Sequence, residues 1–247
     1  MSETKFIKWP KNASPEYIAA RNELTKAEFA LRSQIERVAE MRRSLPLGAP
    51  MADYTFTSGP PDLSNTSALH QTTLADLAAD GRSVVIYHMM FAEDEDKPCP
   101  MCLSFVDALN GVGQHISQRV NLAIAAKAPL EKLRGWGRRR GWSQVRLLSS
   151  QGSTFNKDMD MEHPGWMPEC KQAPGISVFK KDGEGAVRHV YTQLPNFDLD
   201  TGRGMDLLSP LWNLLDMVPE GRNDFDVGFS YLEDVLHVMP FLPNVPT

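Results

Sequence analysis

The sequence predicts an α/β fold in which a mixed β-sheet is flanked by helices and preceded by a long N-terminal helix. Short, β-rich apolar runs alternate with helical patterns between residues 84 and 149, as they do in parallel βαβ units. Two further strand-like runs, 176–179 and 187–191, flank Asp182-Gly183 and predict an antiparallel hairpin. A long amphipathic pattern precedes all of these elements. Together they predict one sheet with parallel and antiparallel strands.

The N-terminal helix is predicted to begin at Ser14-Pro15, with Ser14 as the N-cap and Pro15 in the first helical position. Apolar residues then recur at spacings of three and four as far as Met41, and the pattern stops before Pro46. We interpret residues 1–50 as a helical arm and linker. The arm would pack either on its own domain or on a second subunit.

The next segments predict the main domain, residues 51–221, element by element. The short elements are a strand at 54–57, a helical turn at 73–77, and a strand at 84–91 that is apolar enough to be buried on both faces. The rest are a helix from 99 to about 118, a strand at 120–126, a helix from 129 ending at Gly141, a strand at 145–149, an irregular segment at 150–174, the hairpin, and a helix at 207–218. The tail, 222–247, is too apolar to be left in water, so we expect it to pack against another surface of the protein or of a second subunit.

Composition and charge exclude several classes of function. The net charge is −5 and the chain has no extended basic stripe, which argues against nucleic-acid binding. The short run 138–140, three arginines, is interpreted as a solvated helix C-terminus. No apolar run is long enough for a membrane span, and no secretory signal is recognisable. We therefore expect a cytoplasmic protein without membrane partners.

The chemistry that the sequence offers centres on the dithiol Cys99-Pro100-Met101-Cys102. The pair falls where the strand at 84–91 leads into the next helix. A cysteine at a helix N-terminus lies among unpaired backbone N–H groups, and these favour its thiolate. Cys102 follows one helical turn later, within reach of a disulfide. This pattern predicts Cys99 as the exposed attacking thiol and Cys102 as the sheltered resolving thiol.

Neighbouring residues leave alternatives to a redox-active role of Cys99 and Cys102 open. The acidic run 93–96 would raise the pKa of a nearby thiol, although we expect it to be solvated, with Lys97 as the nearer compensating cation. The cysteines could instead be buried helix residues, or zinc ligands together with Cys170 and His163, whose spacing matches no compact zinc motif. His88 is interpreted as a packed core histidine. The sequence predicts neither a metal nor a cofactor.

Several segments resemble known redox families. Residues 54–91, 145–150 and 176–191 resemble peroxiredoxins and other thioredoxin-like proteins. More closely, VIYHMMF (85–91), APLEKL (128–133) and GISVF (175–179) resemble a bacterial family, domain of unknown function 899, described as predicted dithiol-disulfide oxidoreductases. That likeness covers residues from about 17 to 224. It implies a thioredoxin-like fold and a thiol or disulfide substrate, which can be a protein.

Two departures from the family patterns bear on the activity. Thioredoxins place proline second between the cysteines, whereas Pro100 comes first here; Cys-Pro resembles the peroxide-reacting cysteine of peroxiredoxins. Those enzymes have Thr or Ser three residues before that cysteine, and this chain has Asp96. Thioredoxin-like proteins also carry a cis-proline facing the dithiol, for which Pro174 is the nearest candidate.

Three functions follow from these observations. The favoured one is a thiol-disulfide oxidoreductase using Cys99 and Cys102. The second is a thiol peroxidase in which Cys99 becomes a sulfenic acid and Cys102 or Cys170 resolves it. The third is a catalytically silent thioredoxin-like binding or assembly protein.

The long amphipathic helix and the apolar tail predict a homodimer. A single thioredoxin-like core offers limited surface on which to bury both, and two-fold dimers are the commonest solution. Light scattering in line with size exclusion should give about twice the 27.6 kDa of one chain. A mass near 27.6 kDa at every concentration would mean that both extensions fold back on their own domain.

Overall fold

The computed structural model describes residues 12–195, 205–223, 225 and 227–229. The chain divides into two compact units, Met1–Pro46 and Leu47–Thr247. Among the described residues, no helix is both long enough and apolar enough to cross a membrane.

The first unit contains helix α1, Pro15–Arg43. Its N-terminus has the predicted cap, since the Ser14 hydroxyl accepts a hydrogen bond from the Tyr17 backbone N–H at 3.2 Å. Pro15 occupies the first helical turn, where a missing N–H costs no hydrogen bond. Arg42 and Arg43 lie in the last turn, where cations interact favourably with the helix dipole. The predicted long N-terminal helix is confirmed.

The second unit is built on a seven-stranded mixed sheet in the order β2-β1-β5-β4-β3-β6-β7. Strands β3, β4 and β5 are parallel, whereas β6 is antiparallel to β3 and β7 to β6. A βαβ unit, β3-α3-β4, is thus extended by the β6-β7 hairpin, and this arrangement is a thioredoxin-like fold. The strands are β1 (Thr55–Ser58), β2 (His70–Thr73), β3 (Ser83–His88), β4 (Val120–Ala126), β5 (Arg146–Ser149), β6 (Gly175–Lys181) and β7 (Val187–Gln193).

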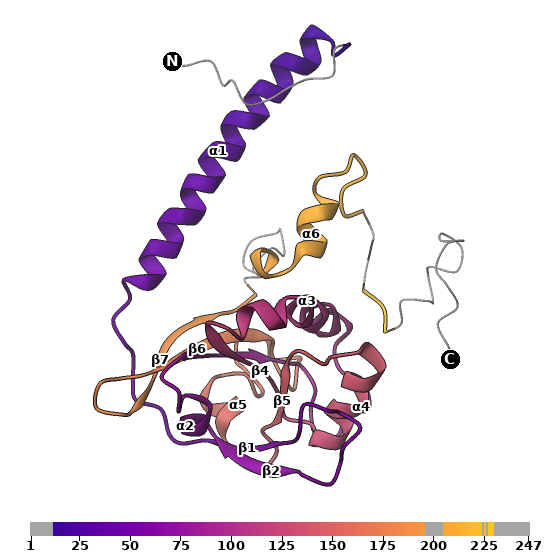
Figure 1. Cartoon of the computed structure of the whole chain (residues 1–247). Helices are drawn as coiled ribbons and strands as arrows, with labels where there is room; N and C mark the ends of the chain where they lie inside the picture. The colour runs from indigo at the N-terminus through magenta and orange to yellow at the C-terminus, as the bar shows by residue number, and fades with distance from the viewer. Residues whose placement is uncertain (1–11, 196–204, 224, 226, 230–247) are drawn as a thin grey trace. The chain divides into compact units, whose positions relative to one another are not determined.

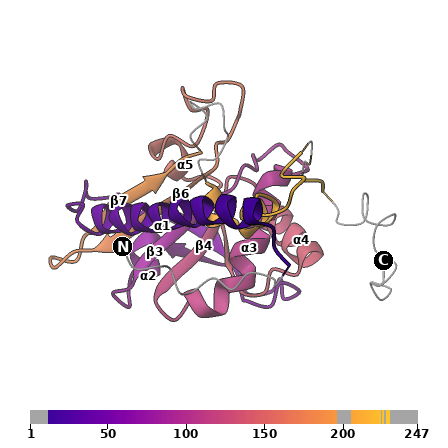
Figure 2. The ribbon, with the colours of Figure 1, turned by 90° about the horizontal axis from the view of Figure 1, so that it is seen from above.

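Helices cover both faces of this sheet (Figure 1; Figure 2 gives the view from above). Helices α3 and α4 pack on the face that carries Tyr87, Ile124 and Leu147. Helices α2 and α5 pack on the opposite face, against residues such as Ile86 and Leu148. The central strands are buried on both faces, as their continuous apolar runs predict. The helices are α2 (Leu74–Leu77), α3 (Pro100–Ile116), α4 (Leu130–Arg140), α5 (Phe155–Asp158), the 3-10 helix η1 (Asp206–Leu208) and α6 (Pro210–Leu215).

Two predicted elements differ from the structure, and two short elements were not predicted: strand β2, and helix α5 within the segment 150–174 that was expected to be irregular. Strand β2 was not predicted, because it is a polar edge strand that pairs with β1 alone and carries no apolar pattern. Strand β3 ends at His88, and the buried residues Met89 and Phe91 belong to the core beyond the strand. The predicted helix 207–218 is divided into η1 and the short α6.

The arginine run at the end of α4 is only partly a solvated helix end. Gly141 ends the helix in the left-handed conformation with φ 70°, as predicted. Arg138 and Arg139 are exposed, but the Arg140 side chain is only 5% exposed and is ion-paired with Asp107. Asp107 also accepts a hydrogen bond from the Trp142 indole at 2.8 Å. The interpretation is therefore wrong for Arg140, which joins α4 to α3.

The described part of the apolar tail packs on other residues of the second unit. Phe225 meets the Trp212 ring edge-on at 6.2 Å, and the Phe229 ring lies 6.1 Å from that of Trp136. The other residues of the predicted tail, 224, 226 and 230–247, lie outside the described residues.

His88 is a packed core histidine, as the sequence suggests. Its side chain is 1% exposed and stacks on Phe155 at 5.2 Å between ring centroids. Its Nε2 atom lies 2.8 Å from the Ser177 hydroxyl. Burial, with a contribution from His189, lowers the pKa of His88 to about 3. His88 is therefore neutral in the folded protein at all moderate pH values.

We expect the stability of the protein to fall in acid partly because of His88. The unfolded chain takes up this proton near the ordinary pKa of 6.5, whereas the folded chain does so only near 3. The unfolded state thus binds more protons in that window, and His88 contributes a loss of up to about 1.4 kcal/mol per pH unit. Urea unfolding from pH 7 to pH 4 should show a shallower pH dependence for His88→Gln. The exposed control His115→Gln should keep the original slope; equal slopes for all three proteins would contradict the assignment.

Candidate functional site

Cys99 lies where the chain turns from β3 into α3. It is the N-cap residue of α3 and is half-buried. Its backbone N–H donates to the Met90 carbonyl at 3.0 Å, which ties the start of the helix to the segment that follows β3. Pro100 takes the first helical position, where it needs no N–H partner. The Cys99 side chain is therefore placed at the N-terminus of a 17-residue helix.

Cys102 lies on the buried side of the same helix turn. It is 1% exposed and lies 4.0 Å from Cys99. The Met90 backbone N–H points at its sulfur with an N–S distance of 3.5 Å. At that separation the two residues are not joined by a disulfide, which would bring their sulfurs to about 2 Å. The structure thus brings Cys99 and Cys102 close together without a bond between them.

The environment of Cys102 opposes its ionisation. Burial raises the pKa of the Cys102 thiol well above 9, and the neighbouring Cys99 raises it further. Two groups lower this pKa, the Tyr87 hydroxyl and the Met90 N–H. The Met90 N–H donates to the sulfur, whereas the Tyr87 hydroxyl lies nearby without a hydrogen bond of standard geometry. Cys102 is consequently a protonated, shielded thiol at neutral pH.

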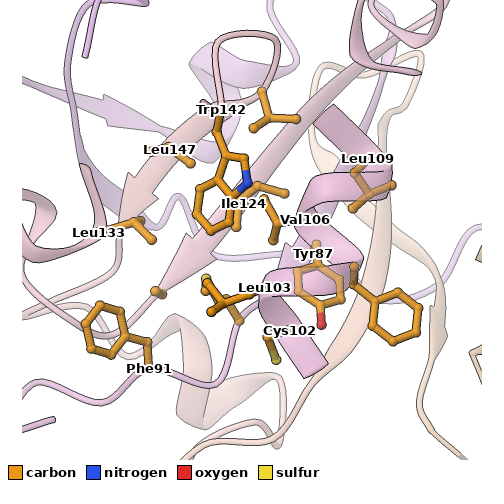
Figure 3. Close-up of a cluster of buried hydrophobic side chains, with 14 of the residues drawn as sticks. Tyr87, Phe91, Cys102, Leu103, Val106, Leu109, Ile124, Leu133, Trp142 and Leu147 are labelled. Atoms are coloured by element: carbon orange, nitrogen blue, oxygen red, sulfur yellow. The ribbon is translucent and has the colours of Figure 1, made fainter. Parts of the chain in front are cut away.

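Tyr87 is a site residue that sequence reasoning missed. It lies in β3 and is 1% exposed, and its hydroxyl has no hydrogen-bond partner of standard geometry. Figure 3 shows this hydroxyl directed toward the part of α3 that carries Cys102. Burial raises the pKa of Tyr87, and the thiol of Cys102 adds to the effect. The sequence did contain a signal for this residue: Tyr87 lies within a strand predicted to be buried on both faces. A buried tyrosine hydroxyl usually has a polar partner, so a polar group near it could have been expected.

Both thiols contribute to the lining of a pocket of about 420 Å³. Most of its other lining residues are apolar, and they come from segments far apart in the sequence. They include four methionines, Met90, Met101, Met167 and Met205, and the aromatic residues Tyr87, Phe105 and Trp212. A half-buried thiol thus lies at the wall of a mainly apolar cavity, the kind of concave site in which proteins bind small molecules.

Pro174 lines this pocket as well, directly before β6. The structure therefore places it beside the dithiol, where the sequence pattern suggested a proline. Its peptide bond is trans, since the described residues contain no cis peptide. Pro174 is thus a wall residue of the pocket and departs in its geometry from the thioredoxin-like cis-proline.

The acidic run before Cys99 is largely solvated and compensated. Asp94 pairs with Lys171 at 2.6 Å, and Asp96, with a side chain 92% exposed, pairs with Lys132 at 3.1 Å. The expected cation, Lys97, instead lies 5.0 Å above the Phe229 ring. The positive charges that face this loop come from residues distant in sequence.

Cys170 is half-buried and lies within electrostatic reach of the dithiol. Burial raises the pKa of its thiol, and Glu169, Cys99 and Glu95 raise it further. His163 is exposed, with a positive φ of 46°. Among the residues that the structure describes, no three His, Cys, Asp or Glu side chains are grouped to hold a metal ion.

A protein-family model matches this chain over residues 8–235, and its description is "Bacterial protein of unknown function (DUF899)". The chain belongs to this family. The match extends past residue 224, so the first part of the apolar tail is within the family's extent, contrary to expectation. Within the family match lie the dithiol, Pro174 and every described residue of the pocket wall. No curated protein matches the sequence.

Solved structures with a similar chain path include several peroxiredoxins. Thioredoxin peroxidase I of Plasmodium yoelii is 15% identical, with a TM-score of 0.46, covering 70% of this chain and 91% of its own. A variant of Xanthomonas campestris peroxiredoxin Q is 13% identical, with a TM-score of 0.45, covering 68% and 96%. The Plasmodium falciparum antioxidant protein, a 1-Cys peroxiredoxin, is 9% identical, with a TM-score of 0.46, covering 62% and 85%.

We expect Cys99 to be alkylated much faster than Cys102. Cys102 is buried and its raised pKa leaves little thiolate at neutral pH, whereas Cys99 faces the pocket. The rate should be measured by mass spectrometry against pH in Cys99→Ser and Cys102→Ser, each carrying Cys170→Ser. The rate for Cys102 should keep rising above pH 9. Equal rates, or a faster Cys102, would reverse the two roles.

Proposed function

We propose that the protein is a thiol-disulfide oxidoreductase in which Cys99 attacks and Cys102 resolves. The observation that carries this proposal is the unequal environment of two thiols 4.0 Å apart. One is half-buried at a helix N-terminus and lines a pocket, and the other is sealed beneath the first turn of that helix. Disulfide exchange needs one accessible thiolate and one nearby thiol that enters only in the second step.

The reaction takes two displacements at sulfur. The Cys99 thiolate attacks one sulfur of a substrate disulfide R–S–S–R′, which forms the mixed disulfide Cys99–S–S–R and releases R′–S⁻. Cys102 then gives its proton to the released R′–S⁻, forming R′–SH, and attacks the Cys99 sulfur, which releases R–S⁻ and leaves a Cys99–Cys102 disulfide. The dithiol has given two electrons to the substrate. A second thiol or dithiol reductant returns the enzyme to its starting state.

Tyr87 supports the second displacement. A buried thiol must ionise at that moment, and ionisation in an apolar core is costly. The Tyr87 hydroxyl and the Met90 N–H are donors directed at Cys102, so they stabilise the thiolate as it forms. In this proposal Tyr87 is a positioning residue for the resolving step and takes no part in the first attack.

The peroxidase alternative has less support. A peroxide-reacting cysteine needs a hydroxyl donor close by to orient the peroxide, and the residue three positions before Cys99 is Asp96. Its side chain is 92% exposed and paired with Lys132. The silent binding protein remains as the outcome expected if neither reaction occurs.

Two assays on the same preparations test the proposal. Thiol alkylation and mass spectrometry after mild oxidation should show loss of two hydrogens, mapping to Cys99 and Cys102. Insulin reduction with a dithiol reductant should be catalysed by the wild type and abolished in Cys99→Ser. Cys102→Ser should instead accumulate a mixed disulfide on Cys99, because the resolving thiol is missing.

Cys170→Ser distinguishes the remaining alternatives. It should leave the 99–102 disulfide and insulin reduction intact. Loss of both in this variant, or an oxidation product that maps to Cys170, would contradict the assigned pair. Peroxide consumption without insulin reduction would assign the protein as a thiol peroxidase, and no oxidation at all would assign it as a binding protein.

A further inference from the structure

The pocket beside Cys99 is built to hold an apolar group. We propose that it selects disulfides carrying a compact apolar substituent, about the size of a benzyl group, next to the sulfur that Cys99 attacks. This inference rests on the proposed disulfide exchange and adds to it the class of substrate.

The lining supplies the first argument. Four methionines reach the pocket from separate segments, Met90 after β3, Met101 in α3, Met167 before β6 and Met205 before η1. Methionine side chains are flexible and polarisable, and they adapt to apolar ligands of varied shape. The pocket volume, about 420 Å³, lies within the usual range for small-molecule sites. The cavity therefore has the room and the surface for one apolar group.

Charge in the wall supplies the second argument. Asp206 and Arg222 are the charged residues among the described lining, and they form an ion pair with each other. Arg222 also pairs with Asp216 at 2.8 Å, and its guanidinium lies 5.2 Å from the centre of the Trp212 ring. These charges satisfy one another and hold the tryptophan wall in place. A charged substrate group would find the cation already engaged.

The chemistry of selection follows from the first displacement. The substituent R enters the pocket, the Cys99 thiolate attacks the adjoining sulfur, and R′–S⁻ leaves toward solvent. Burial of a benzyl-sized group is favourable enough to raise the rate on the order of tenfold or more over a small polar group. The preference lies in the first step and does not require Cys102.

The kinetic test uses three disulfides and the Cys102→Ser/Cys170→Ser variant, which stops after the first displacement. Dibenzyl disulfide is apolar, bis(2-hydroxyethyl) disulfide is neutral and polar, and glutathione disulfide is anionic. Each rate is divided by the rate at which dithiothreitol alone reduces the same disulfide. This normalisation is needed because intrinsic exchange rates depend on the leaving thiol. The apolar disulfide is expected to have the highest normalised rate, ahead of both the polar and the anionic one. Equal normalised rates for the first two would overturn the inference.

A matched pair of substitutions assigns the preference to the pocket. Met167→Gln places an amide of similar size in the lining and should lower the apolar preference several-fold. Met159→Gln is the control, because Met159 is also half-buried but packs in the other core cluster, with α2 and α5. A preference unchanged in Met167→Gln, or reduced equally in both variants, would contradict the assignment.

Two further experiments are needed. The first distinguishes protein disulfides from small-molecule disulfides as substrates, and the second tests the apolar site independently of the oxidoreductase activity. Cystine peptides with phenylalanine or serine beside the disulfide show whether protein disulfides receive the same preference as small molecules. Benzyl methyl sulfide, which cannot react, is titrated by NMR into Cys99→Ser/Cys102→Ser, with methoxyethanol as the polar comparison. Binding of the sulfide without any exchange in the parent protein would refute the oxidoreductase and keep the apolar site. Exchange without such binding or preference would keep the oxidoreductase and refute the site.

Discussion

The packing of α3 against one face of the sheet is the constraint on which the rest of the site depends. Buried residues on one side of α3, including Leu103, Phe105 and Val106, contact the face that carries Tyr87 and Ile124. Cys102 shares that buried side, whereas Cys99 precedes the first turn and stays at the edge of the core. Because a helix turn separates the two thiols while holding them close, their solvent access differs.

The same burial that stabilises the domain sets the chemical contrast within the dithiol. An apolar environment raises the pKa of Cys102 and would make its thiolate costly if no donors faced it. Tyr87 and Met90 supply those donors from the strand next to the helix and from the segment that follows it. The core thus shields the second thiol from solvent and still directs two polar groups toward its sulfur.

The pocket shows how a fold shared by many proteins acquires features of its own. Its wall combines the loop after β3, the start of α3, the loop before β6 and the segment from Met205 to Arg222. The last of these follows the hairpin that completes the thioredoxin-like sheet, and it lies within the residues matched to the family. The ion pairs of Arg222 with Asp206 and Asp216 hold this segment together beside the dithiol. Fold alone does not decide activity, so the character of such a wall carries the information about substrates.

Much of this protein follows from its sequence, because local patterns determine local structure. Alternation of apolar runs predicted β3, β4 and β5, a serine-proline pair predicted the start of α1, and the junction of strand and helix predicted Cys99 at a helix N-terminus. Only the tertiary structure decided what depends on distant contacts: the polar edge strand β2, the pairing of Arg140 with Asp107, and the approach of Tyr87 to Cys102. The apolar pocket belongs to the same group, since its methionines are scattered from residue 90 to residue 205. Spacing along the chain reports which residues share a helix face or a strand face, but only folding brings separate segments together and thereby gives a buried group its partners.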